Sequence, residues 1–174
     1  MDNVGREIMN ILKKITCFIL VIAMIASISG CSLKPHLKLV KQDAKKIFEL
    51  LKNKDADSLS EYFSDDSKKN HNLKEEWKVF FENIDGNIAE YDEISFGGEL
   101  EEYREGELYE HNISVIFKNV KTDTGIIYER LTYYITYVLK DNPSYEGIDG
   151  FVLITNIDDE DKNGLNKIYV GISE

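Results

Sequence analysis

IIYERLTYYITYVL, residues 126–139, alternates between two sets of side chains over its whole length. β-branched and aromatic residues with a period of two predict a long β-strand. One expected face carries Ile127, Leu131, Tyr133, Ile135, Tyr137 and Leu139, and the other carries Tyr128, Arg130, Thr132, Tyr134, Thr136 and Val138. Because aromatic side chains occur on both faces, we expect both to be covered along part of the strand.

Further strand patterns lie on either side of this segment. Gly97-Gly98 is expected to end the first of them, and Asn163-Gly164 is a strong hairpin signal before the last. The expected strands cover residues 88–96, an irregular stretch at 100–103, and residues 107–119, 150–157 and 167–171. These segments predict an antiparallel sheet that fills the C-terminal half of the chain.

Helical patterns precede the strands. Apolar residues at helical spacing predict a first helix that begins near Leu37 and ends near residue 53. Asp55 or Asp57 can cap a second, short helix, residues 64–70 are expected to be a polar loop, and a third helix follows Asn72. Helices followed by a run of strands predict an α+β fold.

The N-terminal part of the chain has the layout of a secretory signal. Lys13 and Lys14 precede an apolar run at residues 15–29, which is short for a membrane-spanning helix. The ending Ile28-Ser-Gly-Cys31 resembles the lipobox of bacterial lipoproteins. The resemblance implies that Cys31 receives diacylglycerol and a fatty acid such as palmitate, and that residues 1–30 are removed as a signal peptide. Residues 31–36 would then be the lipidated Cys and a short tether, and residues 37–174 a single α+β domain.

Two further expectations concern this N-terminal part. Asp2 and Glu7 are unusual ahead of a positive segment, so we expect translation to begin at Met9 and not at Met1. Cys17 would leave with the signal peptide, so no disulfide is expected within the mature domain.

The net charge of the chain limits the classes of molecule that it is expected to bind. The chain has 174 residues and a formal net charge of −11. That charge argues against nucleic acid, because binding a phosphate backbone requires clusters of Lys and Arg. It also repels anionic lipid headgroups, so the lipid on Cys31 would hold the protein on the membrane. The expected location is the outer face of the cytoplasmic membrane, within the cell envelope. Whether the host has an outer membrane stays open.

Residues 52–64, KNKDADSLSEYFS, combine a short polar turn, an Asp, and a Leu and a Phe on a second helix. With the long first helix and the long strands, this motif resembles the nuclear-transport-factor-two-like superfamily, also called cystatin-like. More narrowly, the chain resembles uncharacterised bacterial lipoproteins that carry one such domain of unknown function. The likeness covers about residues 37–172. It implies helices packed against a strongly bent antiparallel sheet, which often leaves a conical pocket.

The resemblance leaves several functions open, because members of the superfamily are enzymes, ligand-binding modules or association domains. Its enzymes place an Asp, or a His–Asp pair, deep in an apolar pocket, where burial makes the carboxylate a useful base. His111 and Glu129 are the catalytic candidates here. We interpret both as surface or strand-end residues and expect no catalysis, because no Asp lies among apolar neighbours in the long central strands.

A possible metal site occurs near the C-terminus. Asp159-x-Asp161-x-Asn163-Gly164 matches the first half of an EF-hand calcium loop. The twelfth position is Val170, where a bidentate Glu is required, and the flanking segments are strand-like. We therefore interpret Asp159, Asp161 and Asn163 as an acidic hairpin tip, and we expect no metal and no cofactor.

Three functions remain in order of preference. The first is a non-catalytic module that binds a small apolar ligand or an envelope protein. Its candidate contacts are Tyr128, Tyr133, Tyr134, Tyr137 and Arg130 on the long strand, because a tyrosine offers apolar area and one hydroxyl. The second is an isomerase- or cyclase-like enzyme with a pocket acid. The third is a structural domain that forms homodimers through an exposed apolar face of the sheet.

Overall fold

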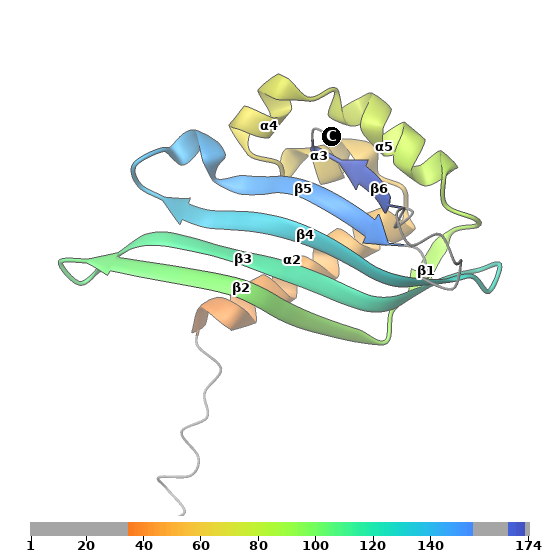
Figure 1. The fold of residues 1–174 in the computed structure, drawn as a ribbon, viewed down its shortest axis with the longest axis horizontal. Coiled ribbons are helices and arrows are strands. Elements are labelled where there is room, and N and C mark those ends of the chain that lie inside the picture. Colours follow the sequence, from red (N-terminus) through yellow and green to blue (C-terminus); the bar gives the residue numbers. More distant parts are fainter. Residues whose placement is uncertain (1–34, 155–166, 173–174) are drawn as a thin grey trace, which may run out of the picture. The chain divides into compact units, whose positions relative to one another are not determined.

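The computed structural model describes residues 35–154 and 167–172. The chain divides into two compact units, residues 1–40 and 41–174. Among the described residues, the first unit holds only the beginning of helix α2. The second unit holds the rest of α2, all the other elements and the sheet shown in Figure 1.

The helices are α2 (Pro35–Lys52), α3 (Ala56–Glu61), α4 (Asp65–Asn70) and α5 (Leu73–Glu82). The predicted first, second and third helices correspond to α2, α3 and α5. Asp55 caps α3, as one of the two predicted alternatives, by accepting a hydrogen bond from the Ser58 backbone N–H at 3.0 Å. Asn72 caps α5 in the same way through the Glu75 N–H.

The segment at residues 64–70 corrects the prediction of a polar loop, because it contains helix α4. Ser64 Oγ accepts a hydrogen bond from the Ser67 N–H at 3.1 Å and caps the helix. Acidic residues lie in its first turn and Lys68 and Lys69 in its last turn, which suits the helix dipole. So short a helix shows little apolar periodicity, and the sequence pattern therefore missed it.

In the described residues, six strands form one antiparallel sheet in the order β1-β3-β4-β5-β6, with β2 also paired to β3. Figure 1 shows β2 at the edge of the sheet beyond β3. The strands are β1 (Ile88–Glu90), β2 (Glu93–Arg104), β3 (Glu107–Thr122), β4 (Ile127–Leu139), β5 (Gly147–Ile154) and β6 (Lys167–Val170).

The strand boundaries differ from the predictions at several places: β3 continues to Thr122, β5 begins at Gly147, and the largest difference is in the first strand. The predicted strand at residues 88–96 is divided between β1 and β2, with a break at residues 91–92. Gly97 and Gly98 do not end a strand but lie within β2, where the register with β3 shifts. A pair of glycines in a strand pattern marks a bulge as readily as an end, and here it marks a bulge.

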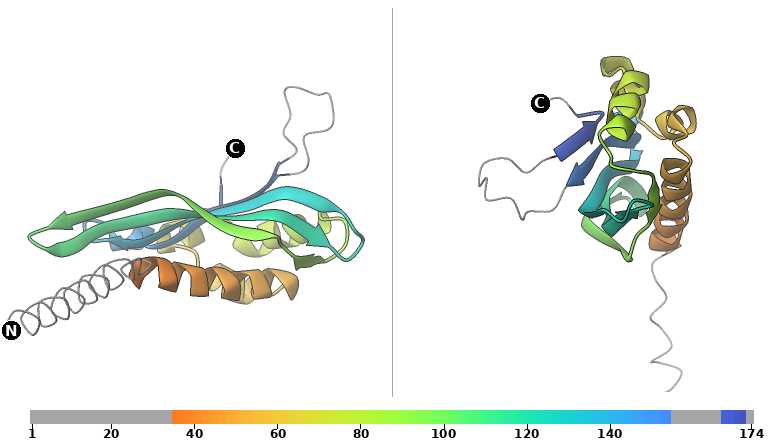
Figure 2. Two further views of the ribbon diagram at one scale, coloured as in Figure 1. Left: turned by 90° about the horizontal axis from the view of Figure 1, so that it is seen from below. Right: turned by 90° about the vertical axis from the view of Figure 1, so that its right-hand side faces the viewer.

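The part of α2 in the second unit, residues 41–52, runs along one face of the sheet, as Figure 2 shows. We call this face the inner face. Ala44, Ile47, Phe48 and Leu51 are buried, and the Phe48 ring lies 5.1 Å from the Phe117 ring of β3. The apolar stripe predicted for this helix is thus its buried side.

Strand β4 contributes Leu131, Tyr133 and Ile135 to the inner face, as the alternation predicts. At its beginning the alternation fails, because Tyr128 is 5% exposed and Ile127 is 43% exposed. Asn119 of β3, close to this end of β4, has a positive φ of 50°. The period of two breaks in β3 at the same level of the sheet, because Phe117 and Val120 are both buried and Val120 lies opposite Tyr128.

The helices join the sheet between α3 and α4. The Ser64 N–H donates to the Ile148 carbonyl at 3.0 Å, and the Ile148 N–H donates to the Tyr62 carbonyl at 2.7 Å. Gly147 has a φ of 126°, and a Cβ there would lie 2.6 Å from the Ser64 nitrogen. Only glycine allows the two backbones to approach so closely.

The α+β class is therefore confirmed, and the conical form of the sheet stays a prediction. No helix among residues 35–154 and 167–172 is long and apolar enough to span a membrane.

Candidate functional site

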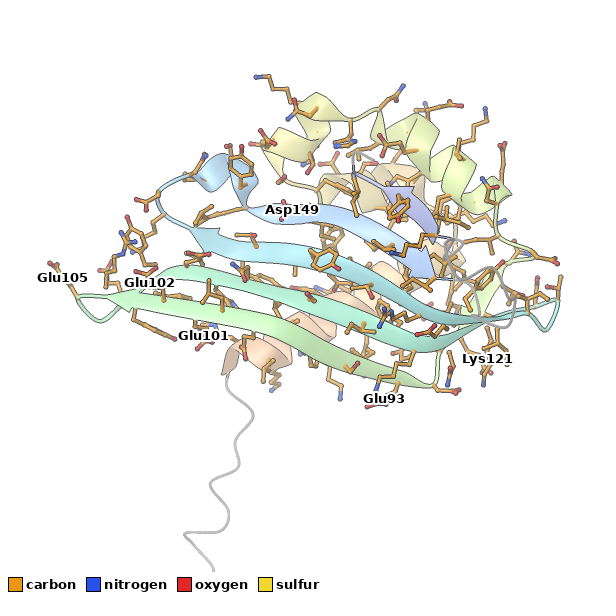
Figure 3. The ribbon with its side chains drawn as sticks, viewed as in Figure 1. Glu93, Glu101, Glu102, Glu105, Lys121 and Asp149 are labelled. Atoms are coloured by element: carbon orange, nitrogen blue, oxygen red, sulfur yellow. The ribbon has the colours of Figure 1, made fainter. Side chains whose placement is uncertain are left out.

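Three ligand-type side chains meet on β2 and β3. The side-chain ligand atoms of Glu99, Glu101 and His111 all lie within 4.8 Å of one another. His111 Nε2 is 3.7 Å from Glu99 Oε1. We call these three residues the Glu–His cluster. Figure 3 labels Glu101 on β2, next to Glu102.

The bulge in β2 brings the cluster together. Gly97 lies opposite Ser114, whereas Leu100 lies opposite Asn112, so β2 has one extra residue between these pairs. Gly98 has a φ of 60°, which suits such a bulge. As a result Glu101, and not Leu100, lies opposite His111. The extra residue therefore moves a carboxylate to the position where a regular strand would place a leucine.

His111 corrects the interpretation of a surface or strand-end residue, because it is 2% exposed. It belongs to the same alternation as Ile113, Val115 and Phe117, which are also buried. The period of two along β3 thus sets the buried side of His111, and its polar character was the misleading signal. The imidazole ring stacks on the Tyr137 ring, with ring centroids 5.4 Å apart and planes inclined by 21°.

Two of the predicted tyrosine contacts lie on the inner face, and one of them, Tyr137, is beside the cluster. Tyr137 is half-buried, and its hydroxyl donates to Asp43 Oδ2 of α2 at 3.5 Å. Burial raises the pKa of the Tyr137 hydroxyl, and the Asp43 carboxylate adds to the effect. Tyr133 is completely buried, and within the described residues its hydroxyl has no hydrogen-bond partner.

Tyr133 packs among aromatic rings, and several polar groups lie near enough to affect its hydroxyl. Its ring lies 5.2 Å from the Phe151 ring and 6.2 Å from the Phe117 ring. Burial raises the pKa of its hydroxyl, with further contributions from Tyr137, Asp43 and Tyr62. An unsatisfied buried hydroxyl costs about 1–3 kcal/mol. Trp77 Nε1 is another buried polar atom without a hydrogen-bond partner among the described residues.

The remaining predicted contacts lie elsewhere. Tyr128 has a structural role, because its hydroxyl accepts a hydrogen bond from the Asp85 N–H at 2.9 Å and anchors the segment after α5. Tyr134 is 46% exposed, and the Arg130 side chain is 47% exposed. The structure thus divides the five candidates into an inner pair, Tyr133 and Tyr137, a buried anchor and two exposed residues.

The two catalytic candidates do not come together. His111 lies opposite Val138, while Glu129 is near the other end of β4 and lies 4.0 Å from Arg130. Nine residues of strand separate the two positions, about 30 Å at the usual rise per residue. No joint acid–base chemistry is available at that distance.

Two of the depressions on the surface of the described residues are large enough to hold a small molecule. One, of about 530 Å³, lies between α3 and α5 and is lined by charged side chains such as Lys54, Asp57 and Lys78. The other, of about 480 Å³, lies beside the β2–β3 turn, where the Arg104 guanidinium is 3.5 Å from the centre of the Tyr109 ring. Neither contains the Glu–His cluster or Tyr133.

Several predicted residues cannot be placed. Cys31, Asp159, Asp161 and Asn163 lie outside the described residues, so the lipid attachment and the calcium-loop interpretation stay predictions.

The sequence reasoning missed Glu99, Glu101 and Asp43. The available signal was the order Gly-Gly-Glu-Leu-Glu at residues 97–101, which places two acids two residues apart directly after a bulge motif. Asp43 had no such signal. An acidic residue on a helix is normally predicted to face solvent, and only the position of the strand beside it shows otherwise.

Fold and site together define an α+β domain whose inner face is apolar at one end and polar at the other. The chain matches, over residues 46–174, a protein family described as a domain of unknown function (DUF5104). The match covers most of the chain, and the protein therefore belongs to this family. No curated protein was similar enough to count as a relative.

Proposed function

We propose that the protein is a lipid-anchored, extracytoplasmic binding module that takes a small, largely apolar ligand on the inner face of its sheet. Tyr133 and Tyr137 are the ligand contacts. The role is recognition and not catalysis. The observation that carries the proposal is the Tyr133 hydroxyl, which is completely buried and has no hydrogen-bond partner among the described residues.

The chemistry of the inner face supports this proposal. The rings of Phe117 and Phe151 pack against Tyr133, so a ligand that reached its hydroxyl would meet apolar side chains. A ligand with one hydrogen-bonding group would satisfy the hydroxyl and recover the free energy that its burial costs. Binding sites for small molecules commonly combine such an apolar lining with a few polar groups.

The anchor is supported by the sequence around Cys31. The positive segment, the apolar run and the four residues Ile28 to Cys31 agree with a lipoprotein signal. A lipid on Cys31 would place the acidic domain at the outer face of the cytoplasmic membrane, although its charge alone would not attract it there.

The ligand is tested by native mass spectrometry of the full chain, released from host membranes in mild detergent. The expected result is a defined adduct on the native protein and its loss in Tyr133→Phe. Tyr134→Phe is the matched control, because Tyr134 is on the same strand but 46% exposed. A bare monomer in the native protein, or an adduct that survives Tyr133→Phe unchanged, contradicts the proposed site.

The anchor is tested separately by feeding cells an alkyne analogue of palmitate. We expect label on the native chain and on Cys17→Ser, and none on Cys31→Ser. Label that persists in Cys31→Ser would exclude lipidation at this residue without affecting the ligand proposal.

The other two functions have weaker support. An isomerase or cyclase would require a pocket acid, and Glu129 is about 30 Å along the sheet from His111. A dimer through the face of the sheet opposite α2 would require an apolar patch around Tyr134. The neighbours of Tyr134 on that face are Thr132 and Thr136 on the same strand and Ser114 on the paired strand, which are polar. A bare dimer in the same mass spectrum would support the association role instead.

A further inference from the structure

We propose that Glu99, Glu101 and His111 form a binding site for one divalent transition-metal ion, of which Zn²⁺ is the test case. This inference goes beyond the proposed ligand binding. The three metal ligands lie on β2 and β3, whereas the ligand proposal rests on the Tyr133 hydroxyl of β4. Tyr137, the second proposed ligand contact, touches the metal site only through its stacking on the His111 ring.

The donor set suits such an ion. One imidazole nitrogen with two carboxylate oxygens fits zinc and related divalent ions, which accept both kinds of ligand. Three protein ligands leave a coordination position for water or another molecule. Thiolate is not required, so a site of this type can operate outside the cytoplasm, where free thiols are oxidised.

The distances are close to those of a bound ion. In a tetrahedral zinc site with bonds of about 2.0–2.2 Å, ligand atoms lie about 3.3–3.6 Å apart. His111 Nε2 and Glu99 Oε1 are 3.7 Å apart, and all three ligand atoms lie within 4.8 Å of one another. Small rotations of the two glutamate side chains would close the remaining difference.

The backbone supports the same conclusion. The bulge at Gly98 places Glu101 opposite His111 and keeps Glu99 within reach of the imidazole. Bulges of this kind commonly direct a side chain toward a functional position. The Tyr137 ring, stacked on His111, restrains the orientation of the imidazole, which is what a metal ligand requires.

The electrostatics also favour a cation. Glu99 and Glu101 bring two carboxylates together beside a side chain that is 2% exposed. Like charges at such a separation raise each other's free energy, and partial burial reduces the screening by water. A divalent ion between them would reverse this repulsion.

The test is a titration of the purified full-length chain, stripped with EDTA, with Zn²⁺ alone in a calorimeter. We expect one ion per chain and a Zn²⁺-dependent rise in the unfolding temperature, because the ion binds only the folded arrangement. X-ray absorption of the loaded protein should show nitrogen and oxygen donors at about 2.0–2.2 Å and no sulfur, which excludes Cys17 and Cys31 as the ligands.

The decisive variant is Glu99→Gln combined with Glu101→Gln, which keeps the size of both side chains. We expect it to fold, as judged by its circular dichroism spectrum, and to bind Zn²⁺ at least about ten-fold more weakly, since loss of mere supporting contacts already has that effect at metal sites. Glu102→Gln is the matched control, because Glu102 is the next residue of β2 and pairs with Arg104 instead.

Three results overturn the proposal. They are the absence of binding by the native chain up to about 1 mM Zn²⁺, equal affinity in the native chain and the double variant, and an equal loss in Glu102→Gln. If the tyrosine variant Tyr133→Phe loses its ligand but keeps Zn²⁺ affinity, the two sites are independent, as proposed.

Discussion

The two ends of the inner face contrast in how the fold uses its interior. At one end Trp77 is completely buried, and its ring lies 5.0 Å from Phe151 and 5.2 Å from Phe80. At the other end His111 is almost as deeply buried, but its neighbours are Glu99 and the Tyr137 ring. Trp77 and His111 are thus buried to nearly the same extent, but the first has aromatic neighbours and the second has a carboxylate beside it. The aromatic end contributes stability, and the polar end keeps groups that a core built only for stability would replace.

The largest expected effect tests the aromatic end. Trp77→Ala should lower the free energy of unfolding by about 3–5 kcal/mol, because it removes a buried aromatic side chain and leaves a cavity. Urea denaturation of the native chain and the variant measures the difference. Val79→Ala, at an exposed position of the same helix, is the control and should change the value by less than about 0.5 kcal/mol. A loss below about 1 kcal/mol for Trp77→Ala would contradict the assignment of the core.

A smaller effect is expected where a tyrosine hydroxyl has a partner. Tyr128→Phe should lower the free energy of unfolding by about 1–2 kcal/mol, because the Asp85 N–H loses its acceptor. The same denaturation experiment measures this value. An unchanged stability would mean that water replaces the hydroxyl at no cost.

At Tyr133, between the two ends of the inner face, removal of the hydroxyl is expected to increase stability, opposite in sign to the effect at Tyr128. Tyr133→Phe should raise the free energy of unfolding of the ligand-free protein by about 1 kcal/mol, because the removed hydroxyl is buried without a partner among the described residues. A gain in stability together with loss of the ligand adduct would mark Tyr133 as a functional residue that the fold retains at a cost. A loss of stability would show that the hydroxyl is satisfied in solution.

The smallest expected effect is on the pH dependence of stability, and it concerns Asp55, the cap of α3, which belongs to neither end of the inner face. The Ser58 backbone N–H, and then the Ser58 side chain, donate hydrogen bonds that lower the pKa of Asp55 from 3.8. The folded-state pKa is below the unfolded value, so the contribution of Asp55 to stability is present above the unfolded pKa and is lost as the pH falls through the folded pKa. The stability of Asp55→Asn should therefore depend less on pH below about 4 than that of the native chain. Parallel curves for both proteins in urea at several pH values would refute this linkage.

The Glu–His cluster illustrates why the sequence could reveal only part of the site. The alternation of β3 was sufficient to place His111 on the side of Ile113, Val115 and Phe117. Its partner across the strand depended on one extra residue in β2, and strand register shifts by a whole position with such an insertion. The sequence therefore identified one member of the cluster and could not identify the two acids that join it.

Local patterns alone determined the class of the protein. Helical spacing before residue 85, a period of two after it, and the cap at Asp55 indicated an α+β domain, because these features depend on neighbouring residues in the chain. The tertiary structure decided the rest. It paired β2 with β3 through a bulge, inserted Tyr128 where alternation placed Ile127, and left the Tyr133 hydroxyl buried. Each of these outcomes depends on contacts between residues distant in sequence, whose balance of packing and hydrogen bonding no local pattern records.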